Sequence, residues 1–292
     1  MRITDHRIVD LAATATARNE ARVGELSNEM SSGLRVAKPS DDPSAWLSAQ
    51  RDRVRAALND GTSQAISTGH DQTVASDGAL STLSALISQA RELAVEGSND
   101  TQNASSRTAI GTELDSIFQT AVSAANTVGA NGEYLLAGTS SLTQPFDTTT
   151  GVYSGDSVSR AVSTDTVSTQ VASVPGSSLT ASSGVDILPL LKTLATAMSA
   201  NDTATIRASL TGLDTAVTQL AQARAQNGGR MAVLESAQTA HTDLATRITT
   251  SISNTVEADS VATATALAKA STALTVSQAV TTRVLQLLDP NK

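Results

Sequence analysis

Apolar residues recur at steps of three and four along several stretches of this chain, which is the spacing that places them on one face of an α-helix. The clearest stretches run from Ile110 to Val128 and from Ile206 to Leu220, with others at residues 80–94, 9–30 and 266–287. Narrow seams of this kind are typical of coiled coils and helical bundles. The pattern predicts a mainly α fold, an elongated bundle of long coiled-coil-like helices formed by the N- and C-terminal halves.

Both ends of the chain are amphipathic and use small apolar residues. Neither end should bury enough apolar surface to be a stable helix alone, so we expect the two to pair with each other or with copies of themselves. The seam residues predicted at the two ends are Val9, Val23, Leu26, Met30, Val280, Val284 and Leu287.

Polar residues indicate where the predicted helices begin and end. The serines of NDTQNASS, residues 99–106, can cap a helix that runs through Val128, and Asn201 and Asp202 can cap one that starts near Thr203. No proline occurs from Thr203 to Leu288. We therefore expect a long helical rod over this stretch, bent at Gly228 and Gly229.

The composition changes between Asn131 and Asp186. NGEYLLAG begins with a turn signal and continues as a strand-like run, and the residues after it are rich in Val, Thr and Ser. These features predict a small inserted β module. The expected organisation is a terminal helix at 1–40 that pairs with a second at 250–292, two halves of a helical rod at 41–139 and 187–249, and a β-rich outer domain at 140–186.

Composition excludes several classes of function. The net charge is −8 without a basic run, which argues against nucleic acid as a partner, and the chain has no cysteine for disulfides or thiolate chemistry. No apolar run is long enough for membrane insertion, and we expect no cleaved signal peptide. His6, His70 and His241 lie far apart, and nucleophile or phosphate-loop motifs are absent. We expect no enzyme activity and no catalytic, cofactor or metal site.

The stretch SSGLRVAKPSDDPSAW, residues 31–46, contains a glycine, two prolines, two basic residues and two adjacent aspartates. Gly33 can end the first helix in a left-handed conformation, and Asp42 can cap the next helix with Pro43 in its first turn. Trp46 either anchors this loop or meets a neighbouring subunit. The remaining charged residues are candidates for contacts between subunits, and these are Arg35, Lys38 and Asp41.

This stretch resembles the N-terminal signature of the flagellin superfamily of bacterial axial proteins. TALTVSQAVTTRVLQLL is similar to the closing helix of that superfamily, and RAQNGGRMAVLESA and VEADSVATA are part of the same resemblance. Within the superfamily, the PSDDP form of the signature and the run NGEYLLAGT, followed by QPFD and GVYSGD, resemble the proteins at the junction of hook and filament more than filament flagellins.

The resemblance implies a structural, extracellular flagellar protein. It would be exported through the type III apparatus, with an export chaperone and without cleavage, and would form a ring of subunits between hook-associated protein 1 and flagellin. The paired terminal helices would lie innermost. Two alternatives remain: a flagellin subunit of the filament itself, and, from the helical stripes alone, a secreted coiled-coil interaction protein.

Overall fold

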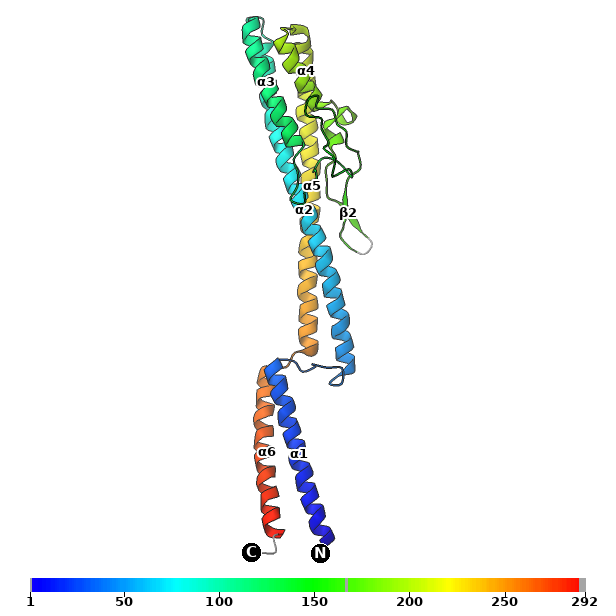
Figure 1. The fold of residues 1–292 in the computed structure, drawn as a ribbon, viewed down its shortest axis with the longest axis vertical. Helices are drawn as coiled ribbons and strands as arrows, with labels where there is room; N and C mark the ends of the chain where they lie inside the picture. The colour runs from blue at the N-terminus through cyan, green and yellow to red at the C-terminus, as the bar shows by residue number, and fades with distance from the viewer. Residues whose placement is uncertain (1, 166–167, 289–292) are drawn as a thin grey trace. The chain divides into compact units, whose positions relative to one another are not determined.

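The computed structural model describes residues 2–165 and 168–288 and is mainly helical (Figure 1). Long helices and a small inserted module with one short sheet confirm the predicted fold class. The elements in chain order are α1 (Arg2–Ser32), α2 (Pro43–Gly97), α3 (Ala104–Ala125), β1 (Ala161–Ser163), β2 (Thr169–Val171), the 3-10 turns η1 (Gly176–Leu179) and η2 (Ala181–Ser183), α4 (Ile187–Ser199), α5 (Thr203–Val256) and α6 (Ser260–Leu288).

The chain divides into two compact units. The terminal unit comprises Met1–Leu58 and Leu244–Lys292, and the central unit comprises Asn59–Asp243. Both divisions fall within long helices, α2 and α5. The boundaries expected from the sequence, at residues 40 and 250, lie closer to the ends of the chain than these two divisions.

The central unit has an apolar core that α2, α3, α4 and α5 build together. Phe118 and Leu114 of α3 are fully buried in it, as is Leu191 of α4. The stripes predicted at 80–94 and 206–220 supply the facing side chains, which confirms the helical period. The buried members of those two stripes are Leu80, Leu83, Ile87, Ala90, Ala94, Ile206, Leu213 and Leu220.

The end of α3 differs from the prediction. The helix stops at Ala125, and Val128 is 46% exposed. Asn126 stops it because its side chain donates to the carbonyl oxygen of Phe146 at 2.9 Å and accepts from the Phe146 amide at 3.0 Å. A tertiary contact twenty residues away thus takes the place of another helical turn.

The start of α3 also differs, whereas that of α5 is as predicted. Asn103, and not one of the following serines, caps α3, because its Oδ1 accepts from the Ser106 amide at 2.8 Å. Asp202 caps α5 by accepting from the Thr205 amide at 3.1 Å.

The rod expected from Thr203 onward is interrupted, but not at its glycines. Gly228 and Gly229 lie inside α5, where an added Cβ would meet nothing within 4 Å. The break comes between Val256 and Ser260. Asp259 starts the new helix by accepting from the amides of Val261 and Ala262 at 2.9 and 3.0 Å.

The segment between α3 and α4 contains less β structure than expected. Within the described residues its only sheet is the antiparallel hairpin of β1 and β2, with Val162 opposite Gln170. The predicted strand NGEYLLAG contributes one isolated bridge, between Val128 and Tyr134, although Leu135 is buried. Backbone hydrogen bonds in turns, side-chain hydrogen bonds and buried apolar side chains hold this module together in addition to its short sheet.

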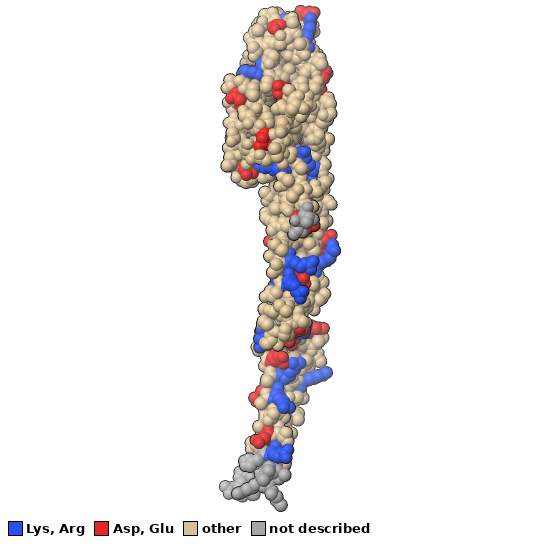
Figure 2. Space-filling view, turned by 90° about the vertical axis from the view of Figure 1, so that its right-hand side faces the viewer, with Lys and Arg blue, Asp and Glu red and all other residues tan. Residues whose placement is uncertain are grey.

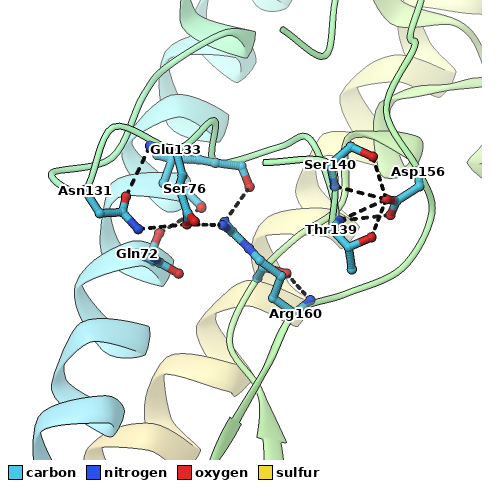
Figure 3. A network of polar contacts seen from close by, with 10 residues as sticks. Gln72, Ser76, Asn131, Glu133, Thr139, Ser140, Asp156 and Arg160 are labelled. Atoms are coloured by element: carbon cyan, nitrogen blue, oxygen red, sulfur yellow. Dashed lines mark hydrogen bonds and ion pairs between the residues drawn. The ribbon is translucent and has the colours of Figure 1, made fainter. Parts of the chain in front are cut away.

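Asp156 organises the module by collecting hydrogen bonds from a neighbouring turn (Figure 3). Its carboxylate accepts from the amides of Thr139, Ser140 and Val158 at 3.0, 3.1 and 2.9 Å, and from the hydroxyls of Thr139 and Ser140. The Thr139 hydroxyl, followed by the Thr139 and Val158 amides, holds the pKa of the Asp156 carboxyl well below its usual range. Arg160, in the same view, pairs with Glu133 at 2.8 Å.

The module should therefore loosen in acid. Because folding lowers the pKa of Asp156, its contribution is present above the unfolded value of 3.8 and is lost as the pH falls through the folded value. We expect Asp156→Ala at pH 7 to reduce the hydrogen-exchange protection of the Thr139 and Ser140 amides by roughly tenfold. Asp243→Ala, at an exposed position of α5, is the control. Unchanged protection in Asp156→Ala would contradict this role.

Candidate functional site

The connector between α1 and α2, residues 33–42, is the candidate site, and it begins as predicted. Gly33 has a φ of +68° and its amide donates to the carbonyl oxygen of Glu29 at 2.9 Å. This left-handed conformation suits glycine because no Cβ is present to clash. The carbonyl oxygen of Gly33 then accepts from the Ala258 amide at 2.9 Å. The connector thus lies beside the break between α5 and α6.

Arg35 holds the end of α5. Its backbone amide donates to the carbonyl oxygen of Val256 at 2.8 Å, and its Nη2 donates to that of Thr255 at 2.7 Å. Leu34 forms a β-bridge with Glu257. The last carbonyls of a helix lack partners within the helix, so these bonds satisfy groups that would otherwise need water. Arg35, a candidate for contacts between subunits, also has this internal role.

Asp41 shapes the turn that precedes α2. Its Oδ2 accepts from the amides of Ala37 and Lys38, both at 3.0 Å. Lys38 Nζ lies 3.9 Å from Asp41 Oδ1, and its side chain is 71% exposed. Arg35 and Asp41 therefore make contacts within the chain, and their contacts with neighbouring subunits stay a prediction. Of the three charged candidates, Lys38 has the side chain with the weakest contact inside its own chain.

Asp42 caps α2 as predicted. Its Oδ1 accepts from the amides of Ser44 and Ala45 at 3.1 and 3.0 Å, and Pro43 is the first helical residue. The Ala45 amide is the main cause of a lowered pKa for the Asp42 carboxyl. Arg35 adds a smaller effect from 3.6 Å.

Trp46 packs inside its own chain, in agreement with the first of its two expected roles. It lies against a small cluster whose buried members are Val36, Ala45, Ala49 and Val256. The guanidinium of Arg53 lies 5.8 Å from the centre of the Trp46 ring. This cluster joins the connector to the start of α2 and the end of α5.

The two terminal helices pair along a seam that is partly polar. Val9, Val23 and Val284 are half-buried and Leu26 is 3% exposed, as expected of seam residues. Between them, Thr16 Oγ1 lies 3.1 Å from Thr281 Oγ1, and Asn19 Nδ2 donates to Ser277 Oγ at 3.1 Å.

Two predicted seam residues lie outside this seam. Val280 is 52% exposed because the hydroxyls of Ser277 and Thr281 face α1, which turns Val280 outward. Met30 is 44% exposed in the last turn of α1, beside the break where α6 is only beginning. The side chain of Leu287 lies outside those that the structure describes.

Several apolar side chains of α1 and α6 have no cover. Their exposed fractions lie between 50% and 75%, so the two helices present apolar side chains to solvent. The residues are Ile8, Leu11, Val261, Val276, Val280 and Leu285.

A groove of about 510 Å³ lies between the last turns of α1 and the connector. Glu25 and Glu29 of α1 line it, with Arg35, Lys38 and Asp41 of the connector. The groove is therefore lined by both acidic and basic side chains. On the face in Figure 2, acidic and basic side chains are likewise interspersed, with wide uncharged areas between them.

The described residues hold no group of three His, Asp or Glu side chains that could bind a metal ion. Among the same residues, no helix is both long and apolar enough to cross a bilayer.

Two polar arrangements were not predicted. Arg107 is buried at the start of α3, and His241 contacts Asn59 across the helix pair. A lone arginine or histidine in a helical pattern carries no sequence signal for such contacts.

Comparison with known proteins finds similarity to flagellar proteins, including a match to a family model in the N-terminal part of the chain. Residues 6–141 match the bacterial flagellin N-terminal helical region. Flagellar hook-associated protein 3 of Salmonella typhimurium is 29% identical over 171 residues, which cover 59% of this chain and 54% of that protein. Flagellin of Clostridium tyrobutyricum is 31% identical over 123 residues, which cover 41% of this chain and 32% of that protein. The chain therefore matches about half or less of the length of these relatives.

Solved structures share the fold. A flagellar hook-associated protein from Vibrio parahaemolyticus superposes with a TM-score of 0.68 at 21% identity, covering 74% of this chain and all of that one. The flagellar junction protein FlgL of Legionella pneumophila gives a TM-score of 0.51 at 14% identity, covering 64% of this chain and 99% of that one. At these identities the likeness concerns the fold alone.

Proposed function

We propose that the chain, whose residues 6–141 match the bacterial flagellin N-terminal helical region, is a structural protein of the bacterial flagellum that joins hook to filament. The main structural support for the proposal comes from the terminal unit. Its paired helices α1 and α6 leave apolar side chains uncovered, and we expect neighbouring subunits to cover them in the assembled structure. The similarity to flagellar hook-associated protein 3 supports the junction over other places in the flagellum.

In this proposal the chain forms a ring of subunits and contacts hook-associated protein 1 on one side and flagellin on the other. It leaves the cell through the type III export apparatus, with an export chaperone and without a cleaved signal, and its final location is extracellular. No enzyme activity, cofactor or metal is required, since the work is mechanical. The junction would adapt hook and filament mechanics through helix contacts.

Flagellin is the second candidate, because the flagellin of Clostridium tyrobutyricum matches a shorter part of the chain at similar identity. Deletion of the gene separates the two candidates. Intact hooks with flagellin shed into the medium support the junction role. Absence of the filament protein itself would favour flagellin, and normal filaments would contradict both. The coiled-coil interaction protein, the third expectation, predicts normal motility after deletion.

The uncovered face can be tested without disturbing the fold. Leu11→Gln with Val276→Gln changes residues that are 69% and 58% exposed, so the free energy of unfolding of the monomer should shift by less than about 0.5 kcal/mol for each change. We expect the double variant to be exported but to fail to restore motility in the deletion strain. Leu142→Gln, at 83% exposure in the central unit, is the control and should restore it. Full motility with the double variant would contradict the proposed face.

A further inference from the structure

A histidine of α5 joins three segments of the central unit. His241 Nδ1 lies 2.7 Å from Asn59 Oδ1 on α2, and its Nε2 lies 2.8 Å from the carbonyl oxygen of Thr164, directly after β1. Asn59 and Thr164 are buried, at 7% and 8% exposure. Asn59 Nδ2 also donates to the carbonyl oxygen of His241 at 3.0 Å. One imidazole thus connects both long helices to the β-hairpin.

The contacts of Asn59 determine which atoms face the ring. Since its Nδ2 donates to a carbonyl oxygen, its Oδ1 is the atom that faces His241 Nδ1, and Oδ1 only accepts. The second ring nitrogen faces another carbonyl oxygen. A neutral imidazole has one N–H and can satisfy one of these acceptors, whereas the imidazolium has two and satisfies both.

We propose that His241 is a protonation-dependent clasp that fastens the β-hairpin to α2 and α5. The charged imidazole donates to Thr164 and to Asn59 together. Loss of one proton leaves one acceptor facing a bare nitrogen, so one of the two bonds opens. This inference concerns the central unit alone and stands apart from the proposed function.

Both acceptors that face the ring are neutral: the side-chain amide oxygen of Asn59 and the backbone carbonyl oxygen of Thr164. Each can accept an N–H from the imidazole but cannot donate to it.

The remainder of the hairpin is attached nearer its base. Val162 and Ala172 pack with Ile66 and Leu234, and Gly69 leaves space for them, since a Cβ there would lie 2.7 Å from Val162 Cγ2. Arg230 Nη1 donates to the carbonyl oxygen of Ser173 at 2.7 Å. These contacts do not depend on an imidazole. Opening of the bond to Thr164 should therefore release the turn end of the hairpin while its base stays in place.

The test follows the full-length monomer from pH 5 to pH 8, the range in which an imidazole titrates. Nitrogen NMR of the ring should show both nitrogens of His241 protonated at pH 5.5. Hydrogen-exchange protection of the amides of Thr164 and Asp165, which donate to the carbonyl oxygen of Ser168, should fall about tenfold by pH 8 after correction for intrinsic rates. Protection around Ser173 should not change.

Three variants make the result decisive. His241→Gln should show low, pH-independent protection of the hairpin turn. His70→Gln, whose ring lies at 33% exposure beside Asp71, is the matched control and should keep the pH dependence. Asn59→Ala removes one acceptor, so the neutral ring suffices and protection should persist at pH 8. A single ring N–H at pH 5.5, or an unchanged pH dependence in His241→Gln or Asn59→Ala, would overturn the proposal.

Discussion

Replacing Phe118 by alanine should lower the free energy of unfolding of the central unit by about 3–5 kcal/mol. Phe118 is fully buried in the core where α3 meets α4, and the ammonium of Lys192 lies 5.2 Å from its ring centre. Removing the ring leaves a cavity that the surrounding helices cannot close without moving. The loss therefore includes both the transfer of the ring and the unfilled space.

Urea unfolding of the purified protein, followed by circular dichroism, measures this loss. Leu142→Ala, at an 83% exposed position, should shift stability by less than about 0.5 kcal/mol and serves as the control. A loss below about 1 kcal/mol in Phe118→Ala would mean that the core is less tightly packed than described.

The second large effect is expected at Arg107, which is 5% exposed at the start of α3. Its Nε donates to the carbonyl oxygen of Gly97 at 2.8 Å and its Nη2 to that of Asn99 at 2.9 Å. Its Nη1 donates to Asn201 Oδ1 at 2.7 Å. One guanidinium thus links the end of α2 to the loop before α5. The positive charge also lies favourably at the C-terminus of α2.

Arg107→Leu should cost about 2–4 kcal/mol, because the buried carbonyl oxygen of Gly97 and the part-buried acceptors on Asn99 and Asn201 lose a charged donor that leucine cannot replace. Arg107→Lys should also be destabilising, since an ammonium cannot reach three acceptors in the planar arrangement of a guanidinium. Thermal unfolding of the two variants tests both statements. Arg91→Leu breaks an exposed pair with Asp214 and should cost less than about 1 kcal/mol. Equal losses at Arg91 and Arg107 would contradict the special position of Arg107.

Much of the helical architecture could be predicted because its signals are local. The steps of three and four among Leu80, Leu83 and Ile87 depend only on the helical period, and burial in the structure agrees with them. Gly33, Asp42 and Asp202 act within three or four residues of their own positions. Such short-range contacts require no knowledge of the remainder of the fold.

The candidate site was only partly predictable for the same reason. Arg35 and Asp41 were identified as candidates for external contacts, yet both make internal bonds. The partner of Arg35 is Thr255, 220 residues away in sequence. In the seam, Val280 looks more suitable than Thr281 by hydrophobicity, but the hydroxyl of Thr281 meets that of Thr16. The packing of α1 against α6 determines which face of each helix lies in the seam. The helical period of the sequence alone cannot distinguish neighbouring positions such as Val280 and Thr281.

Hydrophobic period, capping residues and the connector motif were sufficient to establish the mainly α fold class, many of the helix ends and the flagellin resemblance. Packing in three dimensions was needed for the break at Asp259, the short hairpin in place of a β-rich domain, and the contacts of Arg107 and His241. The physical reason is the range of the interactions. Helical period and caps involve residues a few positions apart, whereas buried hydrogen bonds and seams depend on which distant segments the fold brings together.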